Sequence, residues 1–358
     1  MHFQRKTSYE PDIRLFRHGE QLFWYGLLML ALIAAPLLLP TYYLSQLSFV
    51  CIFTIVGAAL MLLAGFTGQI SLGHAAFLGI GAYTESIMQA RGIPFFISLP
   101  SAMGLSALAG VAIGLPALRM SGIYLAVATM AFGFIVEEVL TRWDSVTLGN
   151  NGMAVAPLSL FGISLKDEWQ IYGVCLAAAL LSMLVLRNLM RSPTGRAFVA
   201  IRDSEISAQS MGIHLARYKT KAFAISAALT GLAGALYAHK VKFLSPDQFG
   251  IVLSVEMMMM VIVGGMGSLH GAVFGAIFLV GLPQLVVALK DQLPSDIAQR
   301  TGLELTAFGL VLLLFVLFEP MGIYGRWLKV RLFLETFPLY RKGTFKRQKS
   351  FTKSDRLR

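Results

Sequence analysis

Long uncharged stretches dominate the pattern of hydrophobic and polar positions along the chain. No formal charge occurs from Gln21 to Thr84, and shorter gaps of the same kind recur as far as Phe318. A membrane-spanning helix needs roughly 20 mainly apolar residues. The pattern therefore predicts about ten spans, near residues 22–40, 44–64, 77–90, 96–116, 123–140, 169–188, 218–239, 252–266, 271–289 and 303–319.

The apolar runs do not alternate between apolar and polar residues, as the strands of a membrane barrel do. The predicted fold class is therefore all-α: a polytopic integral membrane protein with about ten transmembrane helices, some of them short or broken. The third and eighth spans are short and contain glycines, so these two are the candidates for broken or re-entrant helices.

Basic residues cluster in three segments outside the spans. Residues 1–21, 187–221 and 320–358 hold 4, 7 and 11 Lys and Arg residues, which is 22 of the 30 in the chain. Cytoplasmic segments of membrane proteins carry such an excess. We therefore expect these three segments, and with them both termini, to face the cytoplasm.

The amino-acid composition indicates which partners the protein is expected to have. Apolar residues make up 56% of the chain and charged residues 14%, whereas soluble domains average about 25% charged. The net charge of +11 would suggest nucleic acid for a soluble protein, but basic loops explain it in a membrane protein. The lipid bilayer is therefore an expected partner, and nucleic acid is not.

Three parts of the chain are expected. They are a cytoplasmic N-terminal segment over 1–21, a transmembrane domain over 22–325 and a basic cytoplasmic tail over 326–358. The first apolar run is long enough to span and no small-residue cleavage pattern follows it, so we expect an uncleaved first helix. The tail either lies against anionic lipid or is a solvated topology anchor.

The sequence lacks the usual motifs of catalysis and nucleotide binding. There is no G-x-x-x-x-G-K-[ST] phosphate-binding loop and no His/Cys cluster with metal-ligand spacing. Cys51 and Cys175 both fall in apolar segments, where packing is the more common role. We therefore expect no catalytic residue, no cofactor, no metal and no enzymatic activity in this chain.

The longest predicted cytoplasmic loop, about residues 190–217, carries an amphipathic pattern. Ser192 and Pro193 form a good helix start, and Gly212 can end the helix. Four apolar residues fall at helical spacings on one side of it: Phe198, Ile201, Ala208 and Met211. The helix either lies on lipid or docks a soluble partner; Asp203 and Glu205 weaken the lipid alternative because they repel anionic headgroups.

Four blocks in this order resemble the LivM family of permease subunits of branched-chain amino acid ABC importers. The blocks are GQISLGHAAFLGIGAY (68–83), GRAFVAIRDSEISAQSMGI (195–213), YKTKAFAISAALTGLAGALYA (218–238) and VIVGGMGSLHGAVFGA (261–276). The resemblance covers roughly Leu60 to Ile323. It implies a permease in a bacterial cell inner membrane that translocates branched-chain amino acids while separate chains hydrolyse ATP.

The resemblance also implies partners and coupling residues. The partners are a second, LivH-like permease subunit, two ABC ATPase subunits and a periplasmic or surface substrate-binding protein. Glu205, Ala208 and Gly212 resemble the E-A-A---G pattern of importer permeases, with Arg196 and Arg202 as further candidates for ATPase coupling. The Glu-to-Gly spacing is seven residues here and six in that pattern, so this part of the resemblance is imperfect.

Other functions stay open at this stage. Relatives of this fold also carry urea, amides and other amino acids, so the same family allows a different solute. An ion-coupled secondary transporter that works alone is the alternative of a different class, and a polytopic protein whose loop is purely structural is a third.

Polar residues within the spans are the candidates for the translocation pathway. Irregular backbone at membrane depth is tolerated only inside protein or beside water, and intramembrane carboxylates are functional candidates by default. The candidates are Gln69, Ser71, His74, Tyr83, Glu85 and Glu256. The alternative is that the first three only satisfy backbone groups at a helix break.

Overall fold

The computed structural model describes residues 19–117, 120, 122–160, 163–165, 167–290, 303–318 and 321–336. Within these ranges a helix occupies each of the ten predicted spans. The helices are α2 (Gly19–Leu38), α3 (Thr41–Leu60), α4 (His74–Ala90), α5 (Phe95–Ala117), α6 (Ile123–Arg142), α8 (Glu168–Arg191), α11 (Leu215–Val241), α12 (Ile251–Gly264), α13 (Leu269–Lys290) and α15 (Leu303–Phe318).

The helix lengths confirm the predicted all-α polytopic class. Seven helices of the described ranges are long and apolar enough to cross a membrane. The third and eighth spans are indeed short, because α4 has 17 residues and α12 has 14. The N-terminal segment before residue 19 and the tail after residue 336 lie outside the described residues.

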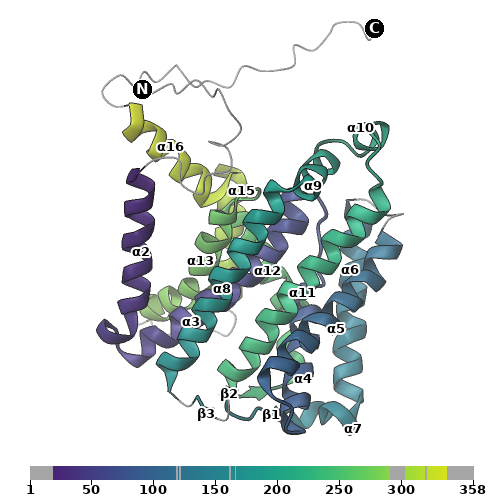
Figure 1. The fold of residues 1–358 in the computed structure, drawn as a ribbon, viewed down its shortest axis with the longest axis vertical. Helices are drawn as coiled ribbons and strands as arrows, with labels where there is room; N and C mark the ends of the chain where they lie inside the picture. Colours follow the sequence, from purple (N-terminus) through teal and green to yellow (C-terminus); the bar gives the residue numbers. More distant parts are fainter. Residues whose placement is uncertain are drawn as a thin grey trace, which may run out of the picture.

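Short elements gather at the two ends of the helix bundle. At one end lie α9 (Pro193–Asp203), α10 (Glu205–Ser210) and α16 (Gly322–Thr336), and at the other lie α7 (Asp144–Thr147) and the strands (Figure 1). β1 (Met153–Ala154) pairs antiparallel with β4 (Phe243–Leu244), and β2 (Ser159–Leu160) with β3 (Ile163–Ser164). Two single turns complete this end, η2 (Gly149–Asn151) and η3 (Pro246–Phe249). We call the two ends the α9 end and the strand end.

Two spans form the centre of the bundle. The apolar windows of Thr41–Phe66 and Leu215–Val241 are each 78% buried, against 22–50% in the other five spans of this kind. α11 packs against α3, α4 and α5, and α3 also contacts α8 and α13. The peripheral helices expose large apolar side chains, as lipid-facing helices do.

Glycines allow α4 and α11 to cross in backbone contact. A Cβ added at Gly234 of α11 would collide with the carbonyl oxygen of Leu78 in α4, and one at Gly81 would collide with the carbonyl oxygen of Gly231. Small residues of this kind let membrane helices approach closely and associate through van der Waals packing. The crossing therefore depends on the absence of side chains at these positions.

We predict that Gly234→Ala destabilises the fold. The added methyl group overpacks the crossing, so the free energy of unfolding should fall by about 1–3 kcal/mol. Gly104→Ala in α5 is the matched control, because nothing lies within 4 Å of a Cβ added there. Equilibrium unfolding in detergent measures both variants, and equal stability of the two would contradict the close crossing.

Candidate functional site

The loop helix at the α9 end starts as the sequence predicts. The Ser192 hydroxyl accepts a hydrogen bond from the Gly195 backbone N–H at 3.4 Å, and Pro193 is the first helical residue. Phe198 and Ile201 are buried, and the Phe198 ring packs edge-on against Tyr218 of α11, with 6.2 Å between ring centroids. One face of α9 is therefore docked on the helix bundle.

The predicted single helix over 192–212 is wrong, because the chain breaks at Ser204. Ser204 has extended backbone angles, and its hydroxyl accepts a hydrogen bond from the Ser207 N–H at 3.2 Å. This second cap begins α10, which runs in a new direction (Figure 1). Serine side chains commonly offer the backbone such an alternative to continuing a helix.

The break separates the coupling candidates into two groups. Glu205 pairs with the buried Lys219 of α11 at 2.7 Å, and Ala208 is 2% exposed, so both anchor α10 to the bundle. Gly212 ends the segment with φ at +82°, and a Cβ there would meet no atom within 4 Å. Arg196 lies exposed on α9, and its guanidinium donates to the Arg191 carbonyl. Arg202 contacts the membrane-spanning part instead.

The sequence analysis missed one residue of this loop, Ile206, and placed another, Met211, on the wrong face. Ile206 is 84% exposed and Met211 is 79% exposed. Met211 was predicted on the apolar side with Phe198, but the break at Ser204 turns it outward. Both apolar side chains are therefore accessible to a partner that packs on α10. The signal for Ile206 in the sequence is that it does not fit the helical spacing of the buried residues.

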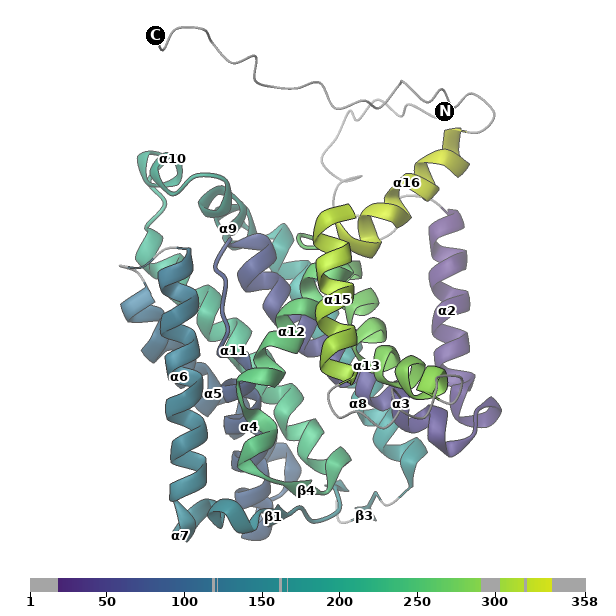
Figure 2. The same ribbon diagram turned by 180° about the vertical axis from the view of Figure 1, so that it is seen from behind.

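The glycine-rich stretch after α3 forms a broken span. α3 continues as a π-helix, η1 (Met61–Phe66), and then the chain becomes irregular from Thr67 to Gly73 before α4 begins. In Figure 2 this stretch descends from beside α9 to the start of α4. The predicted break is therefore present, and it links the α9 end of the bundle to the interior of the bundle.

His74 joins the break to two central helices. Its Nδ1 lies 2.9 Å from the Ser71 hydroxyl and its Nε2 lies 2.9 Å from the Ser226 hydroxyl of α11. Ser226 donates to the Ala59 carbonyl at 2.8 Å, so its only proton is used. His74 Nε2–H must then donate to Ser226, and in the neutral ring Nδ1 accepts from Ser71. The imidazole is fully buried, and both of its ring nitrogens have partners.

Other pathway candidates are buried with unpaired polar atoms. Gln69 is 4% exposed, and neither its amide nitrogen nor its amide oxygen has a hydrogen-bond partner among the described residues; the same is true of the Tyr83 hydroxyl. Glu85 is fully buried; one carboxylate oxygen accepts from Ser98 at 2.8 Å and lies 3.2 Å from His239 Nε2. Its other oxygen has no partner within the described ranges.

Glu256 lies apart from the other candidates. It lines a cavity of about 360 Å³ between α3, α11, α12 and α13. Its neighbours there are Gln46, Phe49, Phe53, Tyr237, Leu253, Leu279, Val280, Pro283 and Gln284. The structure therefore brings Ser71 and His74 together but does not gather all six candidates at one chamber.

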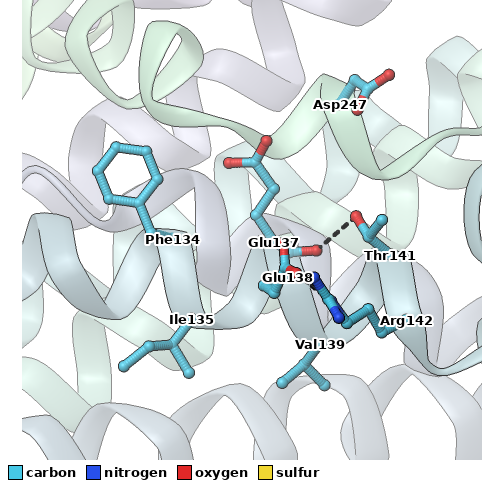
Figure 3. Close-up of a pocket in the computed structure, with 8 residues that line it drawn as sticks. All are labelled: Phe134, Ile135, Glu137, Glu138, Val139, Thr141, Arg142 and Asp247. Carbon is cyan, nitrogen blue, oxygen red and sulfur yellow. Dashed lines mark hydrogen bonds and ion pairs between the residues drawn. The ribbon is translucent and has the colours of Figure 1, made fainter.

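An acidic groove that the sequence analysis did not single out lies near the strand end. It has a volume of about 710 Å³ and is lined by the last two turns of α6 and by Asp247 of η3 (Figure 3). Glu138 pairs with Arg142. The Glu137 carboxylate extends from α6 to the η3 side, where a Cβ on Gly250 would lie 3.2 Å from it.

Within the described ranges, no group of three or more His, Cys, Asp or Glu side chains is placed to hold a metal ion. Cys51 and Cys175 are both buried and free. The arrangement is that of a polytopic helical membrane protein with one broken central span and a helical loop at one end.

Comparison with known proteins gives the family. Residues 42–318 match the family described as "Branched-chain amino acid transport system / permease component". The chain is 32% identical over 329 residues to the high-affinity branched-chain amino acid transport permease LivM of Escherichia coli, which covers 85% of this chain and 75% of that protein. The chain therefore belongs to this family of transport permeases.

More distant relatives carry different names. The permease BraD of Pseudomonas aeruginosa is 23% identical over 306 residues, covering 76% of this chain and 92% of BraD. The autoinducer 2 import permease LsrC of an Enterobacter strain is 27% identical over 243 residues, covering 66% and 68%. No solved structure shows a significant match.

We predict that Ser226→Ala destabilises the broken span. The change removes the donor to the Ala59 carbonyl and the acceptor of His74, so the free energy of unfolding should fall by about 1–3 kcal/mol. Ser101→Ala is the control, because Ser101 donates only to a carbonyl of its own helix. A changed transport constant without any loss of stability would instead assign this network to the translocation pathway.

Proposed function

We propose that this chain is a permease subunit of an ATP-driven ABC importer for branched-chain amino acids. The observation that carries the proposal is the α9–α10 loop, which is anchored to α11 through Glu205 and Lys219 and exposes Ile206 and Met211. The loop offers a firmly held docking surface to a soluble partner. The similarity to LivM and BraD, both named as branched-chain amino acid transport permeases, supports the solute class.

The charge distribution favours a cytoplasmic α9 end. The described basic residues at this end are Arg187, Arg191, Arg196, Arg202, Arg217, Lys219, Lys221, Arg326, Lys329 and Arg331. The described basic residues at the strand end are fewer: Arg91, Arg142, Lys240 and Lys242. This asymmetry follows the positive-inside rule, so we infer an inner-membrane location in which the basic segments 1–21 and 326–358 are cytoplasmic and 22–325 forms the permease domain.

The acidic groove supports a second permease subunit as a partner. Charged side chains are costly at membrane depth unless they face protein or water. Glu138 and Arg142 are 57% and 80% exposed in the last two turns of a membrane-spanning helix, so they offer a charged surface to a partner where α6 leaves the membrane. A LivH-like subunit against α6 would cover the groove or enclose a water-filled path with it. Two ATPase subunits and a substrate-binding protein complete the proposed assembly.

Uptake into vesicles tests the energy source. The chain, reconstituted with its co-purifying subunits, should accumulate labelled leucine, isoleucine or valine when ATP is supplied, and an imposed ion gradient without ATP should drive no uptake. Uptake on the gradient alone would support a secondary transporter. The match to LsrC favours one further solute, autoinducer 2. ATP-driven uptake of autoinducer 2 in place of leucine would change the proposed solute but not the family.

We predict that Ile206→Glu weakens ATPase association. The side chain is 84% exposed, so the fold should tolerate the change, while a buried carboxylate at the interface should weaken binding at least about tenfold. Ile206→Leu, which keeps the apolar contact, is the control. Co-purification of the ATPase with each variant measures the effect, and equal recovery would exclude α10 as the docking surface.

A further inference from the structure

The Arg202 guanidinium reaches in two directions: its side chain is 41% exposed and pairs with Asp203 on the loop, and it also reaches the membrane-spanning part of the protein. Its Nη1 donates a hydrogen bond of 2.9 Å to the Gly65 carbonyl, 137 residues earlier in the chain. Gly65 lies in the last turn of η1, where helix carbonyls have no partner within the helix. A guanidinium at this position also complements the negative end of the helix dipole.

The stem of the same side chain supports the next bend. A Cβ added at Gly68, whose φ is +71°, would lie 3.1 Å from Arg202 Cγ. The Gly68 backbone therefore rests directly on the methylene groups of Arg202. Gly68 belongs to the irregular stretch that leads to Ser71 and His74, and from there to α3 and α11.

A third backbone segment meets the guanidinium. A Cβ at Gly267, whose φ is +89°, would lie 3.4 Å from Arg202 Nη1. Gly267 belongs to the turn between α12 and α13, and its N–H donates to the Met61 sulfur of η1 at 3.0 Å. One side chain of the loop thus contacts the bend after α3 and lies beside the turn between α12 and α13.

We propose that Arg202 is the positioning residue that transmits movement of the α9–α10 loop to both bends. This inference rests on the proposed function, and it changes the role expected for Arg202 from a contact with the ATPase to an internal connection. Arg202 belongs to α9, so a displacement of this helix carries Arg202 with it. Phe198 and Ile201 of the same helix are buried against the bundle. The hydrogen bond to Gly65 and the contact with Gly68 then pull on the broken span directly.

Transport per ATP hydrolysed is the measurement that tests this role. In the reconstituted complex, Arg202→Gln should retain ATPase association and ATP hydrolysis but lower the solute moved per ATP about tenfold, as loss of one coupling interaction predicts. Arg202→Lys keeps the positive charge but lacks the planar guanidinium with its several N–H donors, so it should lower transport per ATP less than Arg202→Gln does. Arg217→Gln is the control, because Arg217 lies at the exposed start of α11. It removes one positive charge at the same end of the bundle and should leave transport per ATP unchanged.

Gly68→Ala provides an independent variant that leaves Arg202 in place. Its methyl group presses on the Arg202 stem, so it should also lower transport per ATP. The double variant Gly68→Ala/Arg202→Gln should lower transport per ATP by less than the product of the two single fold-decreases, because both changes act on one contact. Equal transport per ATP in wild type and both Arg202 variants would overturn the proposal.

Two other outcomes are distinguishable. A loss of ATPase co-purification in proportion to uptake would make Arg202 a partner contact and overturn the internal role. A wild-type complex that moves solute without ATP would overturn the proposed function itself, and the coupling role with it.

Discussion

A backbone that leaves its helix inside a bilayer must find new hydrogen-bond partners, and this requirement organises the centre of the protein. The π-helical end of α3 exposes carbonyl groups at membrane depth. Thr67 donates its hydroxyl to Leu63, and the Gln69 N–H donates to the same carbonyl. Ser226 supplies a donor from α11 and Arg202 one from the loop. The broken span is thus held by groups from three different elements.

Much of the fold could be predicted because charge gaps mark where a chain can lie in lipid. The positions of the ten helices, the short third and eighth spans and the start of α9 at Ser192 all follow from local composition. The second helix of the loop could not be predicted in this way. Ser204 competes for the backbone, and the pair between Glu205 and Lys219 holds α10 in a direction that local spacing does not reveal.

The candidate site was predictable only residue by residue. The rule that intramembrane carboxylates are functional candidates identifies Glu85 from its surroundings in the sequence. Its partner His239 lies 154 residues away, and Gly65 lies 137 residues from Arg202. No local periodicity encodes such pairs, because they depend on how α4 and α11 cross and on where η1 ends. The same reason separates Glu256, in its own cavity, from the network around His74.

Glycine explains why two bends can share one arginine. At Gly65 an added Cβ would lie 2.9 Å from the Gly267 nitrogen, and at Gly68 it would press on the Arg202 stem. Both bends therefore approach each other and the loop closely, with the Met61 side chain packed against their backbones. Interiors packed in this way respond to displacement by moving together rather than by deforming locally. A displacement applied at α9 consequently reaches α4 and α13 at the same time, although these helices are far apart in the sequence.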